Sequence, residues 1–168
     1  MMKRVASFKM AAICCCFLAL AACSKKTQPD LDAGLNGAGT GLGTQAPGSI
    51  GEFEKVIGDR VFFPNDQTSL TPEGEATLAK QAQWLTQYAN VTVQVEGHAD
   101  ERGTREYNIS LSARRATAVR GFLIAHGIAG KRISSIAYGK ERPVALCDAE
   151  QCWSQNRRAV TVITGGAN

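Results

Sequence analysis

The sequence is poor in the residues that most enzymes place at their catalytic centres. Only two histidines, His98 and His126, occur among the 168 residues. The chain contains no G-x-S-x-G nucleophile elbow and no H-E-x-x-H zinc motif. His98 and Asp100, with Ser110 and Ser112 nearby, are residue types that hydrolases use, so a hydrolase is one hypothesis. We expect His126 to cap a helix C-terminus and His98 to position a loop by donating hydrogen bonds.

The excess of basic over acidic residues is also small outside the first nine residues. Lys3, Arg4 and Lys9 precede an apolar run, and removing these three from the 19 basic residues leaves 16 against 15 acidic ones. A nearly neutral chain lacks the dense basic face that phosphate binding requires. We therefore expect no nucleic-acid partner.

The N-terminus has the features of a targeting segment. Residues 1–22 show a basic start, an apolar run too short to span a bilayer comfortably, and small residues at the end, as in a secretory signal peptide. The letters L-A-A-C that end at Cys23 look like a bacterial lipobox, in which this cysteine takes the lipid. Ser24 follows at the position where an aspartate would favour retention in the inner membrane. The resemblance therefore implies an outer-membrane lipoprotein with its domain in the periplasm.

Residues 23–51 lack aromatic side chains and are rich in glycine. A segment of this composition cannot bury a core, so we expect a lipidated N-terminus followed by a flexible linker. The composition changes near Glu52, and residues 52–168 are predicted to form one folded domain.

Within this domain the patterns predict two helices and four strands. Thr71-Pro72-Glu73 is a helix start, and residues 90–97 alternate between apolar and polar side chains as a half-buried strand does. The predicted strands are 60–63, 90–97, 133–138 and 159–164, and the predicted helices start at residue 71 and at about residue 108, the second ending near residue 126. The order β-α-β-α-β-β indicates an α+β fold, a mixed sheet with helices on one face.

One arginine of the second predicted helix interrupts its apolar stripe. Arg115 falls between Leu111 and Val119 on the face expected to be buried. An unpaired buried charge costs several kcal/mol, so Arg115 requires a partner, and Asp100 in the preceding loop is the candidate. The pair is either a structural salt bridge or a site for a ligand that carries both an ammonium and a carboxylate group, as diaminopimelate in peptidoglycan does.

Four segments carry familiar motifs: V-E-G-H-A-D-E-R-G-T (95–104), E-Y-N-I-S-L-S-A-R-R-A (106–116), Y-G-K-E-R-P (138–143) and N-R-R-A-V (156–160). Together they resemble the OmpA-like peptidoglycan-binding domain of the lipoproteins of the Tol-Pal system. The resemblance covers roughly residues 61–163. It implies that Asp100 and Arg115 hold diaminopimelate. The secondary candidates that it implies are Phe63, Asp66, Asn108, Leu111 and Arg157.

The resemblance also implies a function and partners. The domain is expected to bind peptidoglycan noncovalently, without catalysis and without a cofactor or metal, and to tether the outer membrane to the cell wall. TolB and the Tol-Pal complex are the implied protein partners, with roles in envelope integrity and in constriction of the outer membrane during division. The alternative is a periplasmic hydrolase that acts on the wall.

Two cysteines remain near the C-terminus. In an oxidising periplasm, the spacing of Cys147 and Cys152 favours a local disulfide. A metal site would require more ligands. We expect the disulfide to be structural.

Overall fold

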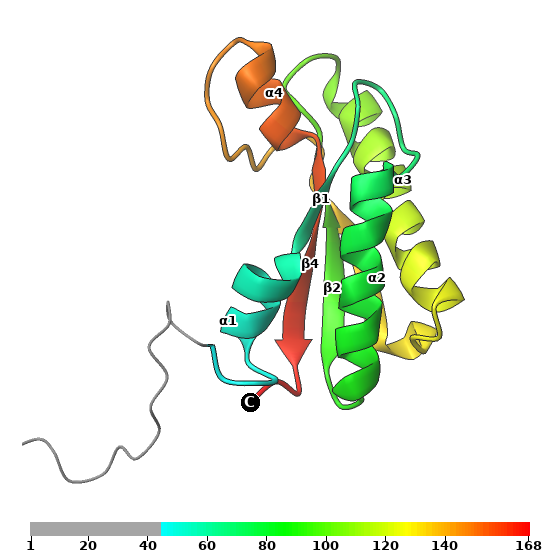
Figure 1. Cartoon of the computed structure of the whole chain (residues 1–168). Coiled ribbons are helices and arrows are strands. Elements are labelled where there is room, and N and C mark those ends of the chain that lie inside the picture. Colours follow the sequence, from blue (N-terminus) through cyan, green and yellow to red (C-terminus); the bar gives the residue numbers. More distant parts are fainter. Residues whose placement is uncertain (1–44) are drawn as a thin grey trace, which may run out of the picture. The chain divides into compact units, whose positions relative to one another are not determined.

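A four-stranded mixed sheet with the strand order β1-β4-β2-β3 forms the centre of the domain (Figure 1). The computed structural model describes residues 45–168. The strands are β1 (Arg60–Phe62), β2 (Thr92–Gly97), β3 (Ile133–Ala137) and β4 (Arg158–Gly165). The helices are α1 (Ile50–Glu52), which continues as a π-helix (Phe53–Gly58), α2 (Pro72–Gln87), α3 (Arg105–Ala125), a 3-10 turn (Gly130–Arg132) and α4 (Glu150–Asn156).

The strand pairing explains the position of the long helices. β4 runs antiparallel to both β1 and β2, whereas β3 runs parallel to β2. Two parallel neighbours need a crossover connection, which α3 supplies. α2 and α3 lie on the same side of the sheet (Figure 1). The predicted α+β fold, with a mixed sheet and helices on one face, is therefore confirmed.

The core lies between the sheet and the two long helices. Val93 and Val95 of β2 are buried, as is Val91 just before the strand, and the side chains between them are at least partly exposed. Leu78 and Leu85 of α2 are fully buried in the same cluster. The alternation of apolar and polar side chains in the sequence thus indicates a strand with one buried face.

Both long helices begin at a threonine cap. The Thr71 hydroxyl accepts a hydrogen bond from the main-chain N–H of Gly74 (3.1 Å), so α2 starts where the sequence predicts. The Thr104 hydroxyl accepts from the N–H of Tyr107 (3.2 Å). Because Thr104 is the cap, α3 begins before the predicted start at Asn108.

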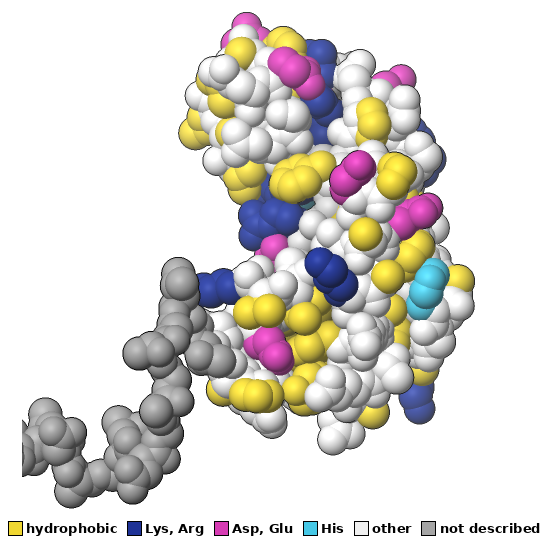
Figure 2. Space-filling view, viewed as in Figure 1, with side chains coloured by type: hydrophobic (Ala, Val, Ile, Leu, Met, Phe, Trp, Pro, Cys, Tyr) yellow, Lys and Arg dark blue, Asp and Glu magenta, His cyan; other side chains and the backbone are white. Residues whose placement is uncertain are grey.

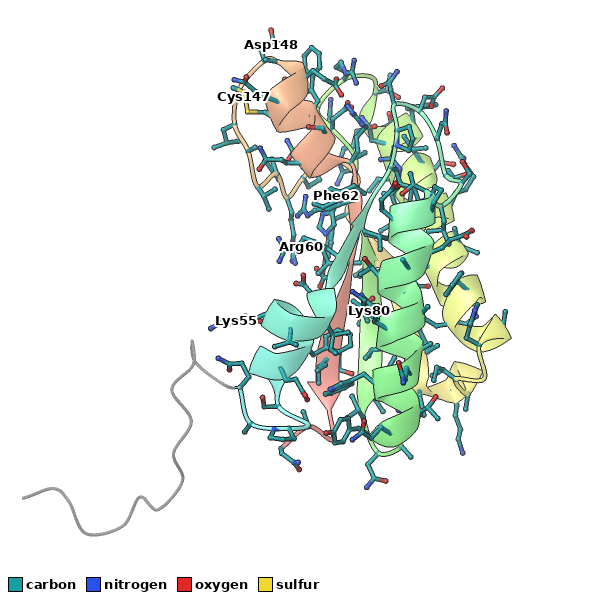
Figure 3. The ribbon with its side chains drawn as sticks, viewed as in Figure 1. Lys55, Arg60, Phe62, Lys80, Cys147 and Asp148 are labelled. Atoms are coloured by element: carbon teal, nitrogen blue, oxygen red, sulfur yellow. A yellow bond between two sulfur atoms is a disulfide. The ribbon has the colours of Figure 1, made fainter. Side chains whose placement is uncertain are left out.

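Helix α4, between β3 and β4, is absent from the predicted element order. The Cys147–Cys152 disulfide joins the loop before this helix to its first turn, with the two Cα atoms 5.6 Å apart (Figure 3). At its end, the Asn156 side chain accepts from the N–H of Ala145 (3.2 Å) and donates to its carbonyl (2.8 Å). Residues 143–156 are thereby fastened at both ends of the helix, and we call them the α4 lobe.

The folded unit begins earlier than the predicted boundary at residues 51 and 52. The Glu52 carboxylate accepts hydrogen bonds from the N–H of Gly48 and from the indole of Trp84, both 2.7 Å long. The ring of Phe53 is buried 4.9 Å from that of Trp84. Residues 45–51, which the sequence assigns to the linker, therefore contact the domain.

The predicted signal peptide and the lipidation site Cys23 lie outside the described residues. Across residues 45–168, none of the helices combines the length and apolar character that a membrane crossing requires.

Replacing both cysteines of the α4 lobe by serine should lower the free energy of unfolding by about 2 kcal/mol, because the unfolded chain loses the constraint of a short closed loop. Urea denaturation of the double variant C147S/C152S measures this difference. We expect binding to cell-wall sacculi to persist in this variant. A folded variant that had lost all binding would contradict a structural role.

Candidate functional site

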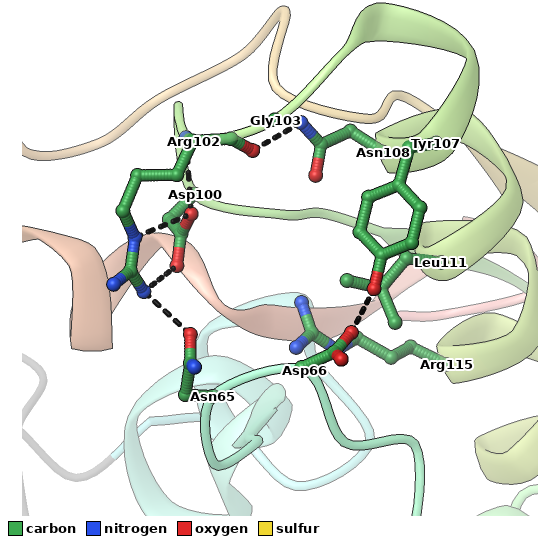
Figure 4. Close-up of a pocket in the computed structure, with 9 residues that line it drawn as sticks. All are labelled: Asn65, Asp66, Asp100, Arg102, Gly103, Tyr107, Asn108, Leu111 and Arg115. Carbon is green, nitrogen blue, oxygen red and sulfur yellow. Dashed lines mark hydrogen bonds and ion pairs between the residues drawn. The ribbon is translucent and has the colours of Figure 1, made fainter.

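A cavity of about 260 Å³ opens where the loops after β1 and β2 meet the N-terminal half of α3 (Figure 4). Five of the residues predicted for the site line it: Asp66, Asp100, Asn108, Leu111 and Arg115. Four further lining residues were not predicted: Asn65, Arg102, Gly103 and Tyr107. The cavity is therefore formed by loops from different parts of the chain that the sheet brings together.

Arg115 is fully buried at the base of this cavity. Its guanidinium donates to three main-chain carbonyls: Nε to Gln67 (2.9 Å), Nη1 to His98 (3.0 Å) and Nη2 to Pro64 (3.3 Å). The guanidinium carbon also lies 5.2 Å from the centre of the Phe63 ring. A guanidinium has five N–H donors, so two of those of Arg115 have no partner among the described residues.

The predicted ion pair between Arg115 and Asp100 is not formed. No salt bridge in the described part of the chain includes Arg115. The prediction was wrong because oriented carbonyl dipoles, rather than a carboxylate, satisfy the buried charge. Burial lowers the pKa of Arg115 to about 10, while the nearby Asp100 has the opposite effect. Arg115 is thus a cation at neutral pH.

The partners of Asp100 are two other arginines. The Asp100 carboxylate accepts from Arg102 at the main-chain N (3.1 Å), at Nε (3.3 Å) and at Nη2 (2.7 Å), and from Arg157 at Nη1 (3.3 Å). Burial alone would raise the pKa of Asp100, but the hydrogen bonds from Arg102 and Arg157 lower it overall. Asp100 is therefore ionised in the cavity wall.

The opposite wall carries a second carboxylate. The Tyr107 hydroxyl donates to the Asp66 carboxylate, and Asp66 has a φ of 56° in the left-handed region, which Asp tolerates better than most residues (Figure 4). The rim is closed by Asn108, whose amide donates to the Arg102 carbonyl (2.7 Å), and by Arg102, whose Nη2 donates to the Asn65 side chain (2.6 Å). Side-chain hydrogen bonds thus connect the loops around the opening.

The charges around the cavity balance. Asp66 and Asp100 supply two negative charges, and Arg102 and Arg115 supply two positive ones. A site with both signs in a confined space suits a small zwitterion better than a simple anion or cation. The free N–H groups of Arg115 can donate to a carboxylate, while the oxygens of Asp66 and Asp100 can accept from an ammonium group.

Two predicted residues lie behind the cavity rather than on its surface. Phe63 is buried and packs against the guanidinium of Arg115. Arg157 is also buried and donates from Nε to the Phe63 carbonyl (3.1 Å) as well as to Asp100. Both residues hold the lining residues in place.

The sequence did contain an indication for three of the four cavity-lining residues that were not predicted. Arg102, Gly103 and Tyr107 all lie between Asp100 and Asn108, within the segments that carry the family resemblance. Asn65 has no comparable signal, because its contribution depends on the turn that follows β1.

His98 does not donate the side-chain hydrogen bonds that we expected. Its ring is 2% exposed, and neither ring nitrogen has a hydrogen-bond partner among residues 45–168. Burial, with the positive charges of Arg158 and Arg142 nearby, lowers the pKa of His98 to about 4, so the ring is neutral at neutral pH. The main chain of His98, rather than its ring, positions the loop, since the His98 carbonyl accepts a hydrogen bond from Arg115.

The serines near His98 are engaged elsewhere. The Ser112 hydroxyl donates to the Ile109 carbonyl (2.9 Å) and accepts from the N–H of Gly139 (3.0 Å). Ser110 accepts from the guanidinium of Arg114 (2.7 Å). The described residues therefore contain no serine–histidine hydrogen bond of the kind that activates a nucleophile. They also contain no cluster of three or more His, Cys, Asp or Glu side chains that could hold a metal ion.

Comparison with known proteins assigns the chain to a family. Residues 62–157, more than half of the chain, match the model of the OmpA family. This chain belongs to the OmpA family. Within the family it is 54% identical over 153 residues to the peptidoglycan-associated lipoprotein of Mesorhizobium japonicum, covering 90% of this chain and 89% of the relative. The corresponding protein of Pseudomonas aeruginosa is 38% identical and covers 89% and 93% of the two chains. The predicted resemblance to the OmpA-like domain of these lipoproteins is confirmed.

Solved structures of two other proteins share the fold. The peptidoglycan-associated lipoprotein of Burkholderia pseudomallei superposes with a TM-score of 0.62 at 39% identity and covers 63% of this chain and 90% of that one. The C-terminal domain of MotB from Helicobacter pylori gives a TM-score of 0.60 at 24% identity and covers 66% and 88%. The latter likeness concerns the fold alone.

Replacing Arg115 by alanine should destabilise the OmpA-family domain by about 3 to 5 kcal/mol, because three carbonyls lose their donor and a buried space is left. Thermal or urea unfolding measures the loss. Arg114→Ala, an exposed neighbour on the same helix, is the control and should change stability by less than about 0.5 kcal/mol. Equal stability of the two variants would disprove the claim that the hydrogen bonds of Arg115 stabilise the fold.

Proposed function

We propose that the domain binds uncrosslinked peptide stems of peptidoglycan at their diaminopimelate residue, noncovalently and without catalysis. The observation that carries this proposal is the charge-balanced cavity, with the buried cation Arg115 at its base and the carboxylates of Asp66 and Asp100 on its walls. The names of the relatives, which describe lipoproteins associated with peptidoglycan, support the same ligand.

The free end of a diaminopimelate side chain carries an ammonium and a carboxylate on one carbon atom. In our proposal the carboxylate accepts from the two remaining N–H donors of Arg115, and the ammonium donates to Asp66 or Asp100. A crosslinked stem has lost this ammonium as an amide, and a lysine stem never has the carboxylate. The site should therefore select free diaminopimelate ends.

We further propose a tether between the outer membrane and the wall. Acyl chains on Cys23 would anchor the protein, since each buried methylene contributes about 0.8 kcal/mol. The glycine-rich segment between Cys23 and residue 45 would then connect the anchor to the domain, and a Gly-rich coil of this length would have an end-to-end distance of about 25 Å. The word lipoprotein in the names of the relatives supports the anchor.

The resemblance to the lipoproteins of the Tol-Pal system leads to the final part of the proposal. TolB would bind this domain and compete with the wall for it. The complex would support envelope integrity and draw the outer membrane inward during division.

Binding of the full-length, detergent-solubilised chain to purified diaminopimelate-type sacculi tests the site. Asp100→Asn removes one of the two negative charges of the cavity and should weaken binding on the order of tenfold. Glu75→Gln on α2 makes the same charge change at an exposed residue outside the cavity and should leave binding unchanged.

Each variant is first checked for folding by circular dichroism. If wild type fails to bind, the proposed function is wrong. If wild type binds and Asp100→Asn binds equally well, the wall contacts a different surface.

Cys23→Ser should prevent lipid attachment and release the protein from the membrane fraction. Labelling with a radioactive or clickable fatty acid, followed by fractionation of membranes, measures both effects. A variant that is still labelled and still membrane-bound would show that the lipid is attached elsewhere.

A further inference from the structure

The α4 lobe lies against the arginines that hold Asp100, although none of its residues lines the cavity. We infer that Trp153 and Glu150, both on α4, are positioning residues that set the affinity of the cavity by fixing Arg102 and Arg157. This inference rests on the proposed function, because it assumes that the cavity is where the peptide stem binds.

Trp153 fixes Arg102 from the outer side. The guanidinium carbon of Arg102 lies 4.1 Å from the centre of the Trp153 ring. The indole N–H of Trp153 donates to the Glu101 carboxylate (2.8 Å), which fixes the plane of the ring. The Arg102 side chain is exposed, and the ring supports it on the outer side in the orientation that reaches both Asp100 and Asn65.

Glu150 holds the second arginine. Its carboxylate forms an ion pair with Nη2 of Arg157 and accepts from Nη1 at 3.3 Å, and the same Nη1 donates to Asp100 at 3.3 Å. Arg157 is thus shared between two carboxylates. The hydrogen bond from Arg157 lowers the pKa of Glu150 and keeps this group ionised. Because Glu150 takes part of the positive charge, Asp100 is left more negative toward a ligand ammonium group than it would be with Arg157 to itself.

The lobe is well suited to hold these two side chains still. The Cys147–Cys152 disulfide closes the start of α4, and the hydrogen bonds of Asn156 to Ala145 hold its end. In Figure 2, dark blue Lys and Arg side chains lie along the seam between the α4 lobe and the rest of the domain. Fixing the cavity wall before the ligand arrives lowers the entropy cost of binding.

The test is binding of the full-length chain to diaminopimelate-type sacculi. Trp153→Ala should weaken binding about two- to fivefold, the range expected from the loss of one cation–π contact. Trp153→Phe keeps an aromatic ring beside Arg102 and should restore most of the affinity. Leu146→Ala is the control, because Leu146 lies in the same lobe, is 84% exposed and is outside the cavity.

A second pair of variants tests Glu150. Glu150→Gln should weaken binding about two- to fivefold through the loss of its charge. Asp148→Asn removes the same charge from an exposed residue of the same lobe and should have no effect (Figure 3).

Combining Trp153→Ala with Arg102→Ala separates positioning from general destabilisation. If Trp153 acts through Arg102, its replacement should have little further effect once Arg102 is absent. Equal effects in both backgrounds would overturn the inference, as would wild-type binding by Trp153→Ala or by Glu150→Gln. Absence of binding by the wild type would instead overturn the proposed function itself.

Discussion

The guanidinium of Arg115 joins three separate segments of the domain. It donates to carbonyls in the loop after β1, at Pro64 and Gln67, and in the loop after β2, at His98, while its own backbone belongs to α3. These three segments are the ones that surround the cavity. The same interaction therefore stabilises the fold and places a cation beneath the ligand site. Removing it would disturb both, so the less deeply buried residues of the cavity are the better probes of binding.

A consequence of this arrangement is that Asp100 is not neutralised by Arg115. Its hydrogen bonds come instead from Arg102 and Arg157, and Arg157 is shared with Glu150. Arg115 thus makes no ion pair with Asp100, which is paired with Arg102 and Arg157 instead. Recognition of a ligand carboxylate by Arg115 depends on this arrangement, because each ligand charge needs an opposite charge that is not already fully used.

Much of the architecture follows from local patterns. The alternation of Val91, Val93 and Val95 identifies a half-buried strand, and Thr71 identifies the start of α2, since both signals depend only on neighbouring residues. The misfit of Arg115 in an apolar stripe correctly indicates a buried charge, which lies against the cavity. Its partners could not be predicted, because carbonyl groups are present at every residue and only the folded loops show which ones point inward.

Other parts of the structure depend on contacts between distant segments. α4 is only seven residues long and has no side-chain hydrogen bond at its N-terminus, so its sequence carries little helical signal. The segment before Phe53 is folded through the bond between Glu52 and Trp84, which are far apart in sequence. His98 was expected to donate hydrogen bonds, yet its ring is buried without partners among the described residues, and its main chain holds Arg115 instead. Family resemblance supplied Asp66, Asn108 and Leu111, which no pattern in the sequence would have selected.

The central claim is that the cavity recognises an ammonium and a carboxylate together. Isothermal titration of the full-length protein with a stem tripeptide ending in diaminopimelate tests it most directly, in comparison with the lysine tripeptide and with the diaminopimelate tripeptide acetylated at its free side-chain amine. Our account predicts binding of the first peptide and a loss of at least about tenfold for each of the other two, because each lacks one of the two charges. Equal binding of all three peptides would contradict it.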